Sequence, residues 1–227
     1  SLQIPLHGPG WNNVSYPVQE TRPVAEALLS INGYYTTVYS YEPAEDPSWK
    51  IYDAAAPHWI NDVDVLEFGH AYWILMRETM TWFLKGASHS SFGQMFAPDS
   101  LTSTAEPAFA NVPATYYGTV KAGTGFTPRA GLPVAAWVDG NSCGTGHTQE
   151  IAGEIVYSVK VLPDGLGGAP GCGTPGKSVW FTTGTQLMEP FAVWENARGA
   201  REQVLHPKVG WSRPPTQVFL PIFSKSQ

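Results

Sequence analysis

The chain has 227 residues, of which 43% are hydrophobic and 14% charged, so it can form one large or two ordinary domains with real cores. Its net charge of −6 and the lack of any Lys- or Arg-rich run argue against a nucleic-acid partner. No apolar run approaches the roughly 20 residues that cross a bilayer. The 23 glycines, 20 prolines and 13% aromatic residues indicate many short strands and tight turns, so we expect a mostly β chain.

Residues 1–86 predict a β-rich module with one short helix. At its start, Leu2, Ile4 and Leu6 alternate with other residues, one of which is Pro5. Because proline has no amide hydrogen, this strand should lie at a sheet edge or pair outside its own sheet. The helix is expected over residues 21–32, with Thr21 as its cap, Val24, Leu28 and Ile31 on one face, and Gly33 ending it. Further strands are expected at residues 11–18, 34–41, 49–52, 71–76 and 81–84.

Five separated motifs characterise the same module. They are Gly10-Trp-Asn-Asn-Val-Ser-Tyr-Pro-Val, the helix from Pro23 to Ile31, Tyr39-Ser-Tyr, Trp49-Lys-Ile-Tyr-Asp and Leu66-Glu-Phe-Gly-His-Ala-Tyr-Trp-Ile. Together they resemble a module of large secreted and surface-attached bacterial proteins, in which a GWNLVSYPV strand precedes a short helix and a LEPGRGYWI strand closes the unit. Here Phe68 stands where proline is usual, and His70-Ala71 where Arg-Gly is usual. That family is a building unit, and the resemblance implies no catalytic residue.

Residues 114–205 predict a second module, with alternating strands at residues 133–138, 155–162 and 179–182 and a last strand at residues 192–196. Its motifs are Tyr117-Gly-Thr-Val, Gly131-Leu-Pro-Val-Ala-Ala-Trp-Val-Asp-Gly and Tyr157-Ser-Val-Lys-Val. They resemble the carboxypeptidase-regulatory-like and related immunoglobulin-like sandwiches. The resemblance implies a sandwich of seven or eight strands without an active site.

The only two cysteines, Cys143 and Cys172, each lie in a Gly-rich stretch that we expect to form a turn. There is no Cys-x-x-Cys motif, so a structural bridge is favoured over a redox pair. Such a bridge closes a loop of about 30 residues and contributes roughly 3 to 4 kcal/mol in the chain-entropy model. A disulfide predicts an extracellular or cell-surface location.

Residues 87–113 are expected to be a linker wrapped over the surface, and residues 206–227 an extended tail. The tail resembles the hydrophobic-Leu-Pro-hydrophobic terminus of some exported bacterial proteins. We hypothesise that apolar strands at both ends pair with the sheet edges of neighbouring copies, or of other envelope proteins, forming a filament or surface layer. The residues of these strands are Leu2, Ile4, Leu6, Val218, Phe219, Leu220, Ile222 and Phe223.

A carbohydrate- or cell-wall-binding module is the alternative, because exposed aromatic rings stack on sugars. The residues considered for this strip are Trp11, Trp49, Trp59, Trp73, Tyr34 and Tyr35. Calcium is a weaker alternative at Asp62, Asp64 and Glu67, which lack EF-hand spacing, so we expect no metal or other cofactor. The six histidines are scattered singly and no pair of acids stands out, so we expect no enzymatic activity.

Overall fold

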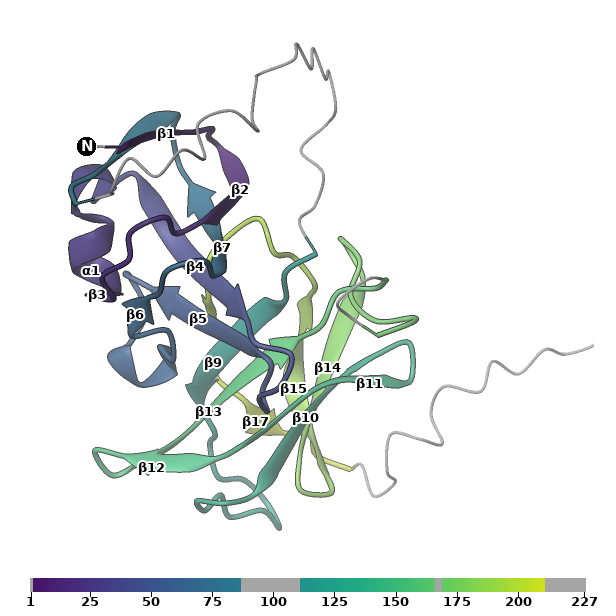
Figure 1. Cartoon of the computed structure of the whole chain (residues 1–227). Helices are drawn as coiled ribbons and strands as arrows, with labels where there is room; N and C mark the ends of the chain where they lie inside the picture. Colours follow the sequence, from purple (N-terminus) through teal and green to yellow (C-terminus); the bar gives the residue numbers. More distant parts are fainter. Residues whose placement is uncertain (1, 87–110, 166–168, 211–227) are drawn as a thin grey trace, which may run out of the picture. The chain divides into compact units, whose positions relative to one another are not determined.

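The computed structural model describes residues 2–86, 111–165 and 169–210 (Figure 1). The chain forms two compact units: unit 1 is Ser1–Ala110 with Ala197–Gly199, and unit 2 is Asn111–Asn196 with Ala200–Gln227. The prediction of a mostly β chain is confirmed, with a short helix in unit 1 and a sandwich in unit 2. No helix of the described residues is long and apolar enough to cross a membrane.

Unit 1 is built around a four-stranded antiparallel sheet in the order β2-β7-β4-β5. One face of this sheet packs Val38, Tyr72 and Ile74 into a core that also contains Leu28 and Ile31. Two further two-stranded sheets pair β1 with β8 and β3 with β6. The strands are β1 Leu2–Leu6, β2 Gly10–Ser15, β3 Arg22–Pro23, β4 Tyr35–Tyr41, β5 Trp49–Asp53, β6 Val65–Leu66, β7 Ala71–Met76 and β8 Met80–Leu84.

The helix is shorter than predicted. It consists of α1 (Val24–Ala27), followed by a 3-10 turn, η1 (Leu29–Ile31), and a second such turn, η2 (His58–Ile60), lies further along the chain. Thr21 does not cap the helix, because Pro23 is the N-cap residue, in an extended conformation, and makes no side-chain cap hydrogen bond. Arg22 and Pro23 pair with β6 instead, so the strand pairing delays the start of the helix.

Strand β1 lies at a sheet edge, as Pro5 predicted, since it belongs to a two-stranded sheet. Within the described residues its strand partner is β8 of the same unit, and Leu6 is buried in the unit 1 core. The Ser30 hydroxyl bonds both the N–H and the C=O of Phe83, so these groups point away from β1. Gln3, which pairs with Phe83, therefore directs its own N–H and C=O away from β8, toward the free edge of β1. Pro5, two residues further along β1, faces the same edge and has no N–H to offer there.

Unit 2 is a sandwich of a five-stranded sheet, β11-β10-β14-β15-β17, and a four-stranded sheet, β12-β13-β9-β16. All neighbouring strands are antiparallel except β16 and β9. Its core contains Val134, Phe181 and Met188 from the first sheet and Tyr116 and Tyr157 from the second. The strands are β9 Ala114–Thr119, β10 Pro133–Val138, β11 Asn141–His147, β12 Gln149–Ile151, β13 Glu154–Val161, β14 Ser178–Thr183, β15 Gln186–Val193, β16 Arg201–Glu202 and β17 His206–Pro207.

The end of the sandwich differs from the prediction. The expected last strand at residues 192–196 is wrong, because β15 begins at Gln186 and ends at Val193, and β16 and β17 follow. Strand β17 takes its two residues from the segment expected to be tail, and Val112, expected in the linker, is buried in unit 2. The C-terminal assembly residues lie outside the described part of the chain: Val218, Phe219, Leu220, Ile222 and Phe223.

Cys143 and Cys172 form the predicted disulfide, with Cα atoms 5.4 Å apart. Cys143 lies on the edge strand β11 and not in a turn; the turn is at Asp139-Gly140, where both φ angles are positive. Gly144 and Gly146, which follow Cys143, lie where two strands approach each other closely. A Cβ atom on Gly144 would lie 2.3 Å from the Lys160 carbonyl oxygen, and one on Gly146 would lie 2.5 Å from that of Ser158. Glycine therefore allows β11 to approach the backbone of β13 in the other sheet.

Candidate functional site

The structure brings three of the predicted sugar-binding tryptophans together on unit 1. Trp49 lies 5.1 Å from Trp73 between ring centroids, and Tyr39 contacts both Trp49 and Trp11, at 6.0 and 5.7 Å. Trp49 is only 3% exposed and Tyr39 only 2%. Trp11 and Trp73 are half-buried, and Tyr41, whose ring centroid lies 4.9 Å from that of Trp49, is 38% exposed, so the cluster keeps part of its ring surface at the protein surface.

The other predicted sugar-binding residues do not join that cluster. Tyr35 is buried in the unit 1 core, and Tyr34 beside it is 39% exposed. Trp59 is half-buried on η2. The ring contacts described above therefore place three of the six predicted residues, Trp11, Trp49 and Trp73, in one cluster.

The three acidic residues considered for calcium, Asp62, Asp64 and Glu67, do not form a metal-ligand group within the described part of the chain. The Asp62 carboxylate accepts the backbone N–H of Ile51, and Asn61 accepts that of Asp53. Among the residues that the structure describes, no three His, Cys, Asp or Glu side chains come together to hold a metal ion. Asp62, Asp64 and Glu67 therefore do not form a site, and two of the polar side chains of this loop bond the backbone instead.

A Gly-x-Ser-x-Gly pattern, Gly140-Asn-Ser-Cys-Gly144, was missed in the sequence. In hydrolases this pattern places the serine on a sharp turn between a strand and a helix. Here Ser142 lies within strand β11, and the next residue, Cys143, is bonded to Cys172. Ser142 is therefore not on the strand-to-helix turn that exposes a nucleophilic serine in hydrolases.

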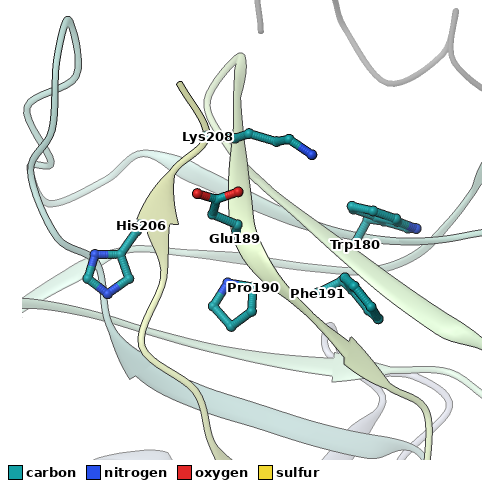
Figure 2. Close-up of a pocket in the computed structure, with 6 residues that line it drawn as sticks. All are labelled: Trp180, Glu189, Pro190, Phe191, His206 and Lys208. Carbon is teal, nitrogen blue, oxygen red and sulfur yellow. The ribbon is translucent and has the colours of Figure 1, made fainter. Parts of the chain in front are cut away.

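The groove of interest lies on the outer face of the five-stranded sheet of unit 2 (Figure 2). It encloses about 480 Å³, and we call it the aromatic groove. Its lining residues are Trp180 on β14, Glu189, Pro190 and Phe191 on β15, His206 on β17, and Lys208.

Strand alternation explains the outward position of Trp180, and an irregularity in strand pairing accounts for the lining residues of β15. The register of β14 and β15 shifts between Val179 and Phe181, and Glu189, Pro190 and Phe191 opposite this point are all exposed. On β14, Val179 and Phe181 are in the sandwich core, so Trp180 between them points to the other face. On β15, Ala192 is in the core and Phe191 is 49% exposed. Figure 2 shows Trp180 and Phe191 at one end of the groove and His206 at the other, with Glu189 and Pro190 between them.

Two aromatic rings form the apolar part of the groove. The centroids of Trp180 and Phe191 are 5.1 Å apart, with 35° between the ring planes. The Lys208 ammonium lies 5.6 Å from the Trp180 centroid, a distance at which a cation is attracted to the ring. Trp137 stands directly opposite Trp180 on the neighbouring strand β10 and donates its indole N–H to Thr182. A row of rings thus runs across β10, β14 and β15.

The rest of the lining is polar and charged. Glu189 stands opposite His206 in the pairing of β15 with β17, and the Pro190 carbonyl accepts a hydrogen bond of 2.7 Å from the Gln203 amide. The polar side chains of the lining are the Glu189 carboxylate, the His206 imidazole and the Lys208 ammonium group. Its chemistry is suited to binding, through stacking on rings and through one carboxylate and one ammonium group.

The sequence predicts the strands that carry these tryptophans but not the face on which they lie. Trp137 and Trp180 belong to the predicted strands at residues 133–138 and 179–182, whose residues are almost all apolar, so alternation does not show which side chains face outward. The sequence did not predict that Glu189, Phe191 and His206 lie on neighbouring strands. The last strand was predicted at residues 192–196, after Glu189 and Phe191, and no strand was predicted at His206.

Comparisons of the chain with protein-family models, with curated proteins and with solved structures found no match. The resemblances of the two modules stay predictions, and the function is proposed from the geometry of the aromatic groove.

Proposed function

We propose that the chain is a non-enzymatic extracellular structural protein that assembles with copies of itself into a filament or surface layer. The observation that carries this proposal is the aromatic groove, where Trp180 and Phe191 are held on the outer face of the sandwich instead of its core. Aromatic residues are enriched in protein interfaces, and large apolar side chains grouped on a surface mark interaction sites.

The disulfide supports the extracellular part of the proposal. Cys143 and Cys172 are bonded and buried, and disulfides persist in oxidising environments such as the cell exterior. The bond fixes the β13–β14 loop to the edge strand β11, which suits a protein that must keep its shape outside the cell.

The N-terminal strand has a smaller part in this proposal than its sequence suggested. Strand β1 is already paired with β8, Leu6 is buried, and Pro5 removes an N–H from the outer edge. The apolar side chains Leu2 and Ile4 pack against the unit 1 core as well. We therefore assign the contact between copies to the aromatic groove.

Electron microscopy of the purified full chain tests the proposal. We expect regular polymers from the native chain and dispersed particles from the double variant Trp180→Ala/Phe191→Ala. The matched control is Phe68→Ala, which removes an equally exposed aromatic ring from unit 1, and it should still polymerise. A native chain that stays dispersed at every concentration would overturn the assembly proposal.

Glycan binding is the second candidate, and the composition of the same groove favours it. A sugar ring has an apolar C–H face that stacks on an aromatic side chain, and hydroxyl groups that bond to side chains such as Glu189, His206 and Lys208. A glycan array separates the two candidates. Binding that is lost in Trp180→Ala, from a chain that does not polymerise, would favour the glycan.

A further inference from the structure

The described chain ends beside the aromatic groove. Lys208 lines the groove, and it is followed by a turn at Val209-Gly210. Gly210 has a φ of +80°, the left-handed conformation with which a turn reverses the chain direction. Trp211 and the sixteen residues after it therefore start within three residues of the groove.

The chemistry of residues 211–227 complements the groove. The segment contains Pro214, Pro215 and Pro221, and its charged residues are Arg213 and Lys225, so it carries +2. The groove itself carries one carboxylate, Glu189, and one ammonium group, Lys208, so the charge complementarity lies between the segment and Glu189. Proline-rich segments adopt an extended helix that docks into aromatic-lined grooves at little cost in entropy.

Individual groups of the groove fit this segment. The rings of Trp180 and Phe191 offer apolar surface to the paired prolines, and the Glu189 carboxylate offers a partner to a guanidinium group. Arg213 is the fifth residue after Lys208, and an extended chain over five residue steps spans at most about 17 Å. Glu189 stands opposite His206, two residues before Lys208, so it is within reach.

The same prolines disfavour sheet extension. Proline does not donate to a strand ladder, and Pro207 occupies one of the two positions of the edge strand β17. Side-chain docking into the groove is therefore favoured over the addition of a strand beside β17.

We propose that the aromatic groove is the docking site of the chain's own C-terminal segment, residues 211–227, with Pro214-Pro215 on Trp180 and Phe191 and with Arg213 on Glu189. The short connection gives the segment a high effective concentration at the groove of its own copy. Exchange of the segment between copies links them in series. Only this exchange rests on the proposed function; the docking itself does not.

Photo-crosslinking of the full chain tests the docking. Thr216, next to the paired prolines, is replaced by p-benzoylphenylalanine, and mass spectrometry locates the crosslink. We expect the crosslink on β14 or β15. Its yield should fall at least about tenfold in Trp180→Ala/Phe191→Ala, as for the loss of a hot spot, and also in Arg213→Glu, while Phe68→Ala keeps it.

A mixture of isotope-labelled and unlabelled chains shows whether the segment comes from the same copy or another. A groove crosslink of either kind supports the docking, and only one between copies supports assembly. Crosslinks elsewhere, a yield that the groove variants leave unchanged, or no crosslink to β14 or β15 would overturn the docking. Polymers without a groove crosslink would leave the proposed function standing and remove this inference.

Discussion

Two buried tyrosines bond the backbone within the sandwich of unit 2. The Tyr116 hydroxyl donates to the Val193 carbonyl at 2.8 Å, and the Tyr157 hydroxyl donates to the Gln203 carbonyl at 2.9 Å. Burial raises the pKa of Tyr116 to about 12, against the lowering effect of Arg201. Burial also raises the pKa of Tyr157, with a smaller contribution from Tyr116. Both hydroxyls therefore stay protonated in the folded chain at pH values that ionise an exposed tyrosine.

These raised pKa values predict a loss of stability in alkali. Below pH 10 both states keep the tyrosine protons, so the free energy of unfolding is independent of these groups. Between pH 10 and about 12 the unfolded state releases the Tyr116 proton first, and stability falls, on the order of 2 kcal/mol for this residue. Urea unfolding measured at several pH values across this range should show that the free energy of unfolding of the native chain falls with pH. In Tyr116→Phe the free energy of unfolding should fall less steeply with pH. An equal slope in both would contradict the assignment.

A methyl group on β11 should be costly where glycine allows close approach. In Gly146→Ala the new Cβ would lie 2.5 Å from the Ser158 carbonyl oxygen, so one strand must move. Overpacking of this kind costs roughly 1 to 3 kcal/mol. Thermal unfolding should show a lower melting temperature for Gly146→Ala. The adjacent exposed Thr145→Ala is the control and should melt close to the native chain; equal losses in both would contradict the close approach.

At the scale of elements, the disulfide fixes a long loop to an edge strand. It joins β11 to the segment between β13 and β14, over a sequence separation of 29 residues. Without the bond, the Cys143→Ser/Cys172→Ser variant should lose roughly 3 to 4 kcal/mol, which lowers the melting temperature of unit 2 by more than roughly 10 °C. Calorimetry should show this shift for unit 2 alone. A transition of unit 1 that moves by the same amount would contradict a local role for the bond.

The sequence predicted best the strands that are short apolar runs with clear ends. Residues 71–76 and 133–138 were predicted with the bounds that the structure has, because each is a short continuous apolar run flanked by turn or polar residues. The helix was predicted too long, because its pattern does not reveal that Arg22 and Pro23 pair with β6. Cys143 was assigned to a turn because glycine serves both turns and close approach.

The aromatic groove was beyond prediction for a related reason. Five of its six residues lie on three neighbouring strands and Lys208 follows β17, and the pairing of β15 with β17 is long-range information that local pattern does not contain. The apolar run at residues 179–182 predicted a strand there but did not show that Trp180 faces outward. It could not show that Phe191 and Lys208 lie beside that ring.

At the scale of the molecule, the two ends of the described chain differ. The N-terminal strand is paired within its own unit, and the C-terminal end of the described residues lies beside the aromatic groove. Strand β1 is held by β8, whereas the described residues end at Gly210, two residues after Lys208 of the groove. The central claim is therefore that copies associate through the groove of unit 2 and not through the N-terminal strand.

Sedimentation velocity of the full chain, over a wide range of concentration, tests that claim most directly. We predict a sedimentation coefficient that rises with concentration for the native chain and for Phe68→Ala, and one that stays at the monomer value for Trp180→Ala/Phe191→Ala. A coefficient that rises equally in the groove variant, or that stays constant in the native chain, would contradict the claim.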